Sequence, residues 1–83
     1  MTEILQFSTP SCGQCPQQAE ILQSLAADRP SVQFEKIDAT EATAKANEYG
    51  ARSVPSTIVL DDDGAVISKF DGLTQAATIE DVL

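Results

Sequence analysis

Hydrophobic residues gather along the chain in short runs separated by polar and turn-forming stretches. Four runs are rich in apolar or β-branched residues and show little alternation, which is typical of strands covered on both faces. The predicted strands are Glu3–Phe7, Val32–Asp38, Ser56–Leu60 and Ala65–Phe70. Between the last two, residues 61–64 read Asp-Asp-Asp-Gly. The final Asp-Gly pair predicts a tight hairpin turn.

Three other segments carry apolar residues at helical spacing. They are residues 13–27, 39–50 and 73–83, and their inward positions are Ile21, Leu22, Leu25 and Ala26 in the first, Ala42, Ala46 and Tyr49 in the second, and Ala76, Ile79 and Leu83 in the third. Gly50 is expected to end the second helix, because glycine accepts the left-handed conformation that follows many helices.

The order of these elements is βαβαββα. A whole helix connects the first two strands, so they are expected to be parallel, whereas a four-residue turn makes the last two antiparallel. The sequence therefore predicts an α/β fold, in which helices flank a mixed four-stranded sheet. Residues 1–83 are expected to form a single domain, since the chain has no repeat, linker or low-complexity segment.

The amino-acid composition disfavours some classes of function. Five Lys and Arg face 13 Asp and Glu, and the formal net charge of −8 repels nucleic acid and anionic membranes. No apolar run approaches the roughly 18 residues of a membrane-spanning helix. The start, Met1–Phe7, lacks the basic residues and long apolar stretch of a secretory signal, which fits the cytoplasmic location that we expect but would also hold for a mature secreted chain. The acidic surface is interpreted as a solvated face, and adaptation to high salt stays open.

The chain has two cysteines, Cys12 and Cys15. A bond closing so short a loop adds little stability, which disfavours an inert structural disulfide. A zinc site needs about four ligands, and a chain without histidine or a second cysteine pair does not supply them alone. Asp61–Asp63 lack the spaced ligands of a calcium loop, so no metal is expected there. An inert bond and a metal site shared between two chains stay open, but C-x-x-C in a βαβ context favours a redox pair.

The predicted elements place Cys12 just after the first strand, at the entry to the first helix. A helix start has unpaired N–H groups and a partial positive charge, both of which stabilise a thiolate. Cys15 is expected about one turn further on and less exposed. Cys12 would then attack a substrate disulfide, and Cys15 would resolve the mixed disulfide. Val54-Pro55, before the third strand, is by itself most simply a trans proline at a strand entry.

Three motifs together resemble the thioredoxin family over essentially the whole chain. They are C-G-Q-C after the first strand, V-P before the third, and F-D-G at residues 70–72. The resemblance implies a thioredoxin fold with a minimal βαβαββα core. It also implies a monomeric protein disulfide reductase with no bound cofactor. Its substrates would be proteins with disulfides, and its electron donor a reductase protein.

The resemblance also implies the residues of the site. Cys12 would be the nucleophile and Cys15 the resolving thiol, beside a cis Val54–Pro55 bond. The backbone of Val54 would pair with an extended substrate peptide, and Gly72 would let that peptide approach closely. The implied substrate-binding residues are Ser11, Gly13, Gln14, Ser53, Val54, Pro55 and Gly72.

The chain departs from the family pattern at several points. It begins at the core strand, as glutaredoxins and small archaeal thioredoxins do, and Ser11 stands where a tryptophan is usual. Gly13-Gln14 replaces Gly-Pro. Gln6 occupies the position of a buried aspartate that relays a proton to the resolving thiol. An amide does not relay protons, so either water or another carboxylate takes that task or the resolving step is slower.

Two alternatives of function remain. C-G-Q-C-P partly resembles the glutaredoxin motif, which points to a glutathione-dependent reductase. However, the stretch at residues 70–75 has one glycine where glutaredoxins have two, and Arg52 and Lys36 are the only basic residues expected near the site. The negative charge also disfavours an anionic tripeptide. The other alternative is a non-catalytic binding module on the same fold.

Overall fold

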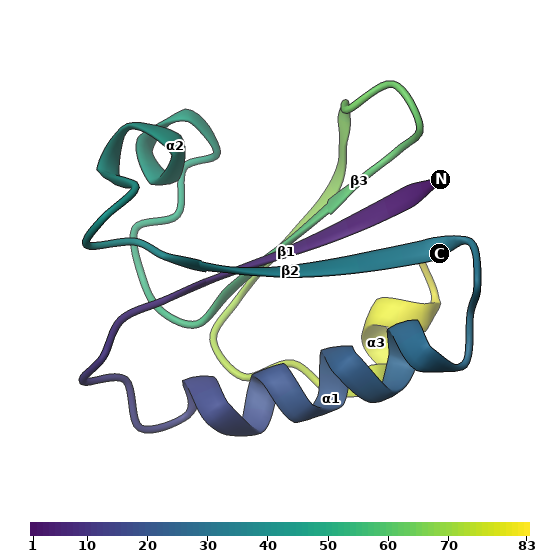
Figure 1. Cartoon of the computed structure of the whole chain (residues 1–83), viewed down its shortest axis with the longest axis horizontal. Coiled ribbons are helices and arrows are strands. Elements are labelled where there is room, and N and C mark those ends of the chain that lie inside the picture. Colours follow the sequence, from purple (N-terminus) through teal and green to yellow (C-terminus); the bar gives the residue numbers. More distant parts are fainter.

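A computed structural model describes residues 1–83 as one four-stranded sheet with helices on both faces (Figure 1). The strands are β1 (Thr2–Ser8), β2 (Val32–Asp38), β3 (Ser56–Leu60) and β4 (Val66–Asp71), and the helices are α1 (Cys15–Ala27), α2 (Thr43–Glu48) and α3 (Ala76–Glu80). All seven predicted elements are present in the predicted order, so the expected α/β class and βαβαββα core are confirmed.

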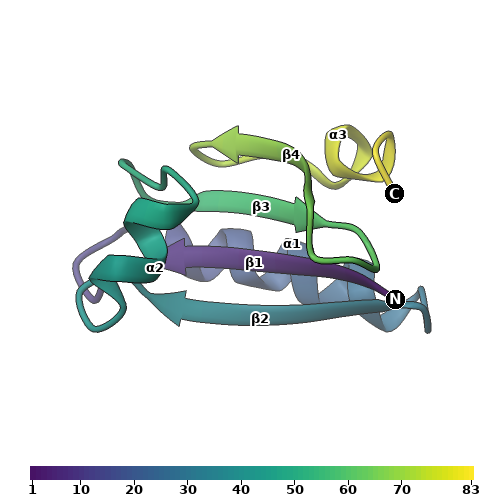
Figure 2. The ribbon, with the colours of Figure 1, turned by 90° about the horizontal axis from the view of Figure 1, so that it is seen from above.

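The strand order across the sheet is β2-β1-β3-β4 (Figure 2). β1 runs parallel to β2 and antiparallel to β3, and β3 runs antiparallel to β4. The two central strands have neighbours on both sides and helices on both faces. Residues 4–8 of β1 and all of β3 are therefore buried. The edge strand β4 has no buried residue, and in the edge strand β2 only Val32 and Ile37 are buried.

Two apolar clusters hold the helices to the sheet. Figure 1 shows α1 and α3 on one face and α2 on the other. The first cluster joins α1 and α3 to the sheet and contains Ile4, Leu22, Leu25, Val32, Val59 and Ile79. The second lies under α2 and contains Leu5, Phe7, Ile37, Ala46, Ile58 and Leu60. Successive strand residues alternate between the clusters, because successive side chains point to opposite faces of a sheet.

The second helix is shorter than the predicted 39–50. The carboxylate of Asp38 accepts hydrogen bonds from the backbone N–H and the hydroxyl of Thr40, which forms a turn in place of a first helical turn. The same bonds hold the pKa of Asp38 below its ordinary value. At the other end, Gly50 has φ +69° and Ala51 N–H bonds to the carbonyl of Ala46. Gly50 therefore follows the helix end, as predicted.

The third helix is also shorter than the predicted 73–83. Its first residues are drawn into a loop, because the backbone of Thr74 is hydrogen-bonded to a side chain of α1. Ile79 is fully buried, and Ala76 and Leu83 pack against the same cluster. The prediction of which residues of this third segment face the core is thus correct, although the predicted bounds of the helix are not. None of the three helices has the length and apolar character needed to span a membrane.

Candidate redox site

Three loops that are far apart in sequence meet at one end of the sheet. β1 ends at Ser8, and the cysteine loop follows it. β3 begins at Ser56, which lies opposite Phe7 of β1 and Asp71 of β4. The residues before β3 and those after β4 therefore lie at the same sheet end as the cysteine loop. This end thus carries the three motifs C-G-Q-C, V-P and F-D-G.

Cys12 and Cys15 form a disulfide in this structure, with their Cα atoms 5.4 Å apart. Cys12 is partly exposed, whereas Cys15 is only 2% exposed. The first helix begins at Cys15 and not near Gly13, so the expected placement shifts by two residues. Cys12 lies in the loop before the helix, and its N–H bonds to the carbonyl of Thr9. The predicted difference in exposure between the two sulfurs is present.

The helix start beside this disulfide has little internal capping. Gln14 is the N-cap residue, and its side chain makes no capping hydrogen bond. The first N–H with a helical partner is that of Gln18, which bonds to the carbonyl of Gln14. Pro16 has no N–H, and those of Cys15 and Gln17 find no acceptor in the chain. Such free N–H groups and the positive end of the helix favour a negative charge on a nearby sulfur.

The segment before β3 leaves its backbone available. The Val54–Pro55 peptide bond is cis. Neither the N–H nor the C=O of Val54 has a hydrogen-bond partner in the chain, although Val54 is only partly exposed. Pro55 is buried, and its carbonyl accepts the N–H of Gly72 at 2.8 Å. An unpaired backbone N–H and C=O beside a reactive site are groups with which an extended peptide can pair.

The remaining residues implied by the family resemblance lie at or near this end. Gly72 has φ +78°, and a Cβ built on it or on Gly13 meets nothing within 4 Å, so there is open space above both. Ser11, Gly13, Gln14 and Ser53 are exposed. Ser53 also accepts a hydrogen bond from the hydroxyl of Ser56 through its carbonyl. The basic residues Lys36 and Arg52 are both exposed.

Behind the disulfide, the buried polar groups are uncharged. The Gln6 side chain is fully buried, and its Nε2 donates to the carbonyl of Cys15 at 3.0 Å. Gln6 lies directly opposite Thr57 on β3, so both side chains point to the α1 face. Gln6 Oε1 and Thr57 Oγ1 are buried without a partner in the chain. The buried polar residues are Gln6, Ser8, Gln18, Ser56 and Thr57, so no buried carboxylate takes the place of the family's aspartate.

The sequence predicts Thr57 only as a β-branched residue of the third strand. Because its buried hydroxyl lacks a partner, Thr57→Val should raise the free energy of unfolding by about 1 kcal/mol. Urea unfolding followed by circular dichroism measures the change. Thr78→Val, at an exposed position, is the control and should change stability little. A marked loss of stability in Thr57→Val would show that the hydroxyl makes a stabilising hydrogen bond.

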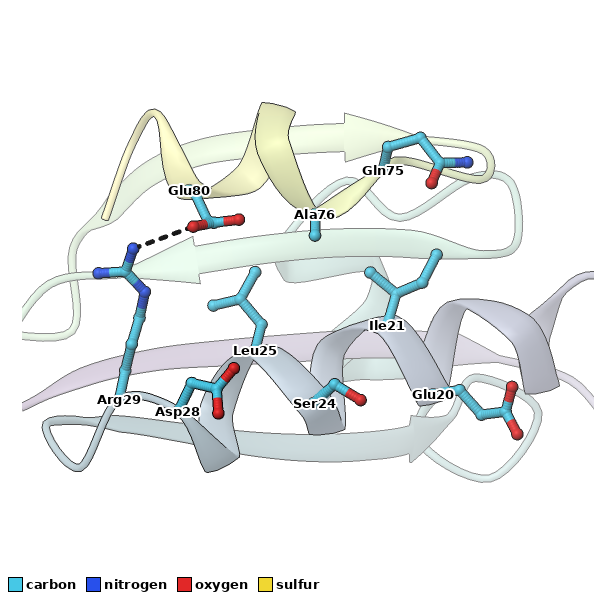
Figure 3. Close-up of a pocket in the computed structure, with 9 residues that line it drawn as sticks. All are labelled: Glu20, Ile21, Ser24, Leu25, Asp28, Arg29, Gln75, Ala76 and Glu80. Atoms are coloured by element: carbon cyan, nitrogen blue, oxygen red, sulfur yellow. Dashed lines mark hydrogen bonds and ion pairs between the residues drawn. The ribbon is translucent and has the colours of Figure 1, made fainter.

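The surface has two hollows, and neither contains a cysteine. The larger, about 370 Å³, lies between α1 and α3 (Figure 3) and is lined by Glu20, Ile21, Ser24, Leu25, Asp28, Arg29, Gln75, Ala76 and Glu80. Arg29 pairs there with Glu80 at 3.2 Å. The smaller, about 240 Å³, is lined by Ser8, Thr9, Pro10, Lys36 and Asp38. No group of three or more His, Cys, Asp or Glu side chains is arranged to hold a metal ion.

The fold and the site define a class of small α/β domains with a disulfide at the start of a helix. The thioredoxin family model matches residues 2–83. The thioredoxin of Chlamydia caviae is 33% identical over 84% of this chain and 68% of its own length. That of Methanocaldococcus jannaschii is 38% identical over 69% and 67%. Oxidised mitochondrial thioredoxin 3 of Saccharomyces cerevisiae superposes with a TM-score of 0.86 at 26% identity, covering 98% of this chain and 76% of its own.

The chain belongs to the thioredoxin family. Membership, the fold and the Cys12–Cys15 disulfide together support thiol–disulfide oxidoreductase activity. The resemblance seen in the three sequence motifs is thereby confirmed. Gln18, Thr74 and Thr57 are residues of the site region that sequence reasoning missed. The signal that could have found Gln18 and Thr57 is a polar residue at a helix or strand position that faces the core, whereas Thr74 lies in a loop and carries no such signal.

Proposed function

We propose that this protein reduces disulfides in other proteins, with Cys12 as the nucleophile and Cys15 as the resolving thiol. The observation that carries the proposal is the unequal exposure of the two sulfur-bearing residues. Cys12 is partly exposed in a loop, and Cys15 is 2% exposed at the first position of α1. A substrate disulfide can reach Cys12, whereas Cys15 is accessible mainly to Cys12.

The reaction runs in two exchange steps. The Cys12 thiolate attacks one substrate sulfur, a Cys12–substrate bond forms, and the other substrate sulfur leaves and takes up a proton. Cys15 then attacks Cys12, the mixed disulfide breaks, and the proton from Cys15 goes to the released substrate sulfur. The substrate gains two electrons and two protons. The protein is left as the Cys12–Cys15 disulfide, which is the form in this structure.

Val54, Pro55, Gly72 and the exposed residues beside Cys12 are proposed to form a shallow groove that binds the peptide around the target disulfide. The unpaired N–H and C=O of Val54 would bond to its backbone beside Pro55. The open space over Gly72 and Gly13 leaves room for a second chain. Ser11, Gln14 and Ser53 line the approach to Cys12 with small or flexible polar side chains.

The partners follow from this chemistry. Each turnover oxidises the protein, so a second reductant must return it to the dithiol, and we propose a reductase protein. Lys36 and Arg52 are the only basic residues proposed to lie near the site, and the net charge of −8 disfavours anionic glutathione. No bound cofactor is needed for the exchange. A cytoplasmic location is proposed because a reductase works where the thiol pool is reducing.

The test is competitive alkylation of the reduced protein with iodoacetamide across pH 4–10, read by peptide mass spectrometry. Cys12 should react at least roughly tenfold faster than Cys15 and remain reactive at a lower pH than a free cysteine peptide does. The exposed position of Cys12 and the free N–H groups of the helix start are the physical reasons. Turnover of a disulfide-bonded protein such as insulin is then compared with two donors, thioredoxin reductase with NADPH and glutathione with its reductase.

Slow and equal alkylation of the two thiols would contradict the proposal and favour a binding module. Efficient turnover with glutathione alone would make the protein a glutaredoxin-like reductase. The control for alkylation is the same protein unfolded in urea, in which the two cysteines should react at similar rates.

A further inference from the structure

The side chain of Gln18 connects α1 to a loop that is 56 positions away in sequence. Gln18 lies one turn after Cys15 and is fully buried. Its Nε2 donates to the carbonyl of Thr74 at 3.0 Å, and its Oε1 accepts the N–H of Thr74 at 2.7 Å. The amide therefore pairs with both backbone groups of one residue, as a neighbouring strand would.

The loop held by this amide carries Gly72. The Thr74 hydroxyl donates to the carbonyl of Gly72 at 3.1 Å, and the N–H of Gly72 donates to the carbonyl of Pro55 at 2.8 Å. The loop between β4 and α3 is thus tied at one end to Pro55 and at the other to α1. Covalent and hydrogen bonds thus form a continuous path around the site, which runs from Cys15 through Gln18, Thr74 and Gly72 to Pro55.

Stability alone does not explain an amide at this position. Gln18 is fully buried on α1, one turn before Leu22 of the apolar cluster, and a leucine or methionine of similar size would bury more apolar area there. A buried amide is retained without cost only when both of its polar atoms are paired, and here both pair with Thr74. The specific effect of Gln18 is therefore on the position of the loop.

We propose that Gln18 is a positioning residue for substrate binding. Its amide holds the loop so that Gly72 stays against Pro55 and forms one wall of the groove that receives the peptide around the target disulfide. The inference rests on the proposed reductase function and adds to it a residue outside the groove. Both hydrogen bonds of the Gln18 amide go to Thr74 and neither goes to a sulfur, so its loss is expected to affect peptide binding and not the intrinsic reactivity of Cys12.

The first test uses Gln18→Leu with two substrates. The KM for a disulfide-bonded protein should rise roughly tenfold with kcat nearly unchanged, because the unpaired Thr74 groups pull the loop toward water. The rate with a small aromatic disulfide that has no peptide, 5,5′-dithiobis(2-nitrobenzoate), should stay within about twofold of wild type. Gln23→Leu, at an exposed position further along the same helix, is the matched control and should leave both unchanged.

The second test is Gln18→Glu, which nearly preserves the shape of the side chain. A protonated carboxyl donates to the Thr74 carbonyl and accepts its N–H, as glutamine does, whereas an ionised carboxylate cannot donate. The ratio of the Gln18→Glu KM to the wild-type KM, both measured at the same pH, should therefore be well above one at pH 8. It should fall toward one as the pH is lowered to 5. Gln18→Leu should show no such recovery. This pH-dependent rescue is a result that a purely structural role would not produce.

Hydrogen exchange separates this inference from the proposed function. Gln18→Leu should speed exchange at the amide of Thr74 by about tenfold or more, whether or not the protein is a reductase. If exchange and KM are both unchanged, or if both substrates lose rate equally, the positioning role of Gln18 is wrong. If the wild-type protein reduces no disulfide while the exchange effect is present, the proposed function fails and the substrate role of Gln18 fails with it, but the anchoring of the loop stands.

Discussion

Cys12→Ser should lower the rate of protein disulfide reduction by at least roughly a thousandfold, whereas the reaction of the Cys15→Ser variant should stop after the first exchange step. Cys12 is the partly exposed cysteine and has to make the first attack. Without Cys15, the mixed disulfide on Cys12 has no resolving thiol within the chain. Cys15→Ser should therefore accumulate a covalent complex with the substrate, and Cys12→Ser should not.

Intact mass spectrometry after mixing with an oxidised protein substrate measures the covalent complex, and the turnover assay measures the rate. The complex should disappear on addition of dithiothreitol, because only a disulfide is reversed by it. The double variant Cys12→Ser/Cys15→Ser is the control for non-specific adducts. A stable complex formed by Cys12→Ser through Cys15 would show that Cys15 is the nucleophile and Cys12 the resolving thiol. Turnover retained by either variant would exclude a dithiol mechanism.

Leu22→Ala should lower the free energy of unfolding by about 2–5 kcal/mol. Leu22 is fully buried in the cluster that joins α1 to the sheet, where it packs with Ile4 and Val59. Its truncation removes apolar contacts and leaves a cavity. A domain of this size has a total stability on the order of 5–10 kcal/mol, so the variant should be close to unfolding.

Urea and thermal unfolding measure the loss, with Gln23→Ala at the adjacent exposed position as the control. The control should stay within about 0.5 kcal/mol of wild type. The alkylation rates of Cys12 and Cys15 should also converge in Leu22→Ala, because α1 carries Cys15 and its packing keeps that thiol buried. A loss below about 1 kcal/mol would show that α1 is held to the sheet mainly by contacts other than Leu22.

Local patterns were sufficient to predict most of the fold. The apolar runs of β1 and β3 have no polar alternation because both strands are central, and that pattern is visible in the sequence itself. Connection lengths determined which strand pairs run parallel, since a hairpin turn and a helical crossover permit only one direction each. The tight turn at Gly64 and the helix end at Gly50 were predictable because each needs a positive φ.

Helix bounds were predicted less well, because their limits depend on contacts outside the helix. Residues 39–42 have the composition of a helix, but the Asp38 carboxylate holds Thr40 in a turn. Leu73 continues the apolar spacing of α3, but Gln18 holds the backbone of the next residue, Thr74, in a loop. At Thr74 the Gln18 side chain occupies the carbonyl that a helix would use as an acceptor, whereas at Thr40 the Asp38 carboxylate stabilises a turn through groups that make no helical bond at a helix start.

The sequence by itself determined the class of fold, the position of Cys12 between β1 and α1 and of Cys15 at the start of α1, and the chemistry that two such thiols permit. These features depend on periodicity, connection length and spacing, which are local properties of the chain. Only the tertiary structure decided which residues surround the disulfide. The neutral pair Gln6 and Thr57 behind it, the free peptide groups of Val54 and the hold of Gln18 on Thr74 all depend on strand order and helix packing. Contacts of this kind join residues far apart in sequence, and no local pattern specifies them.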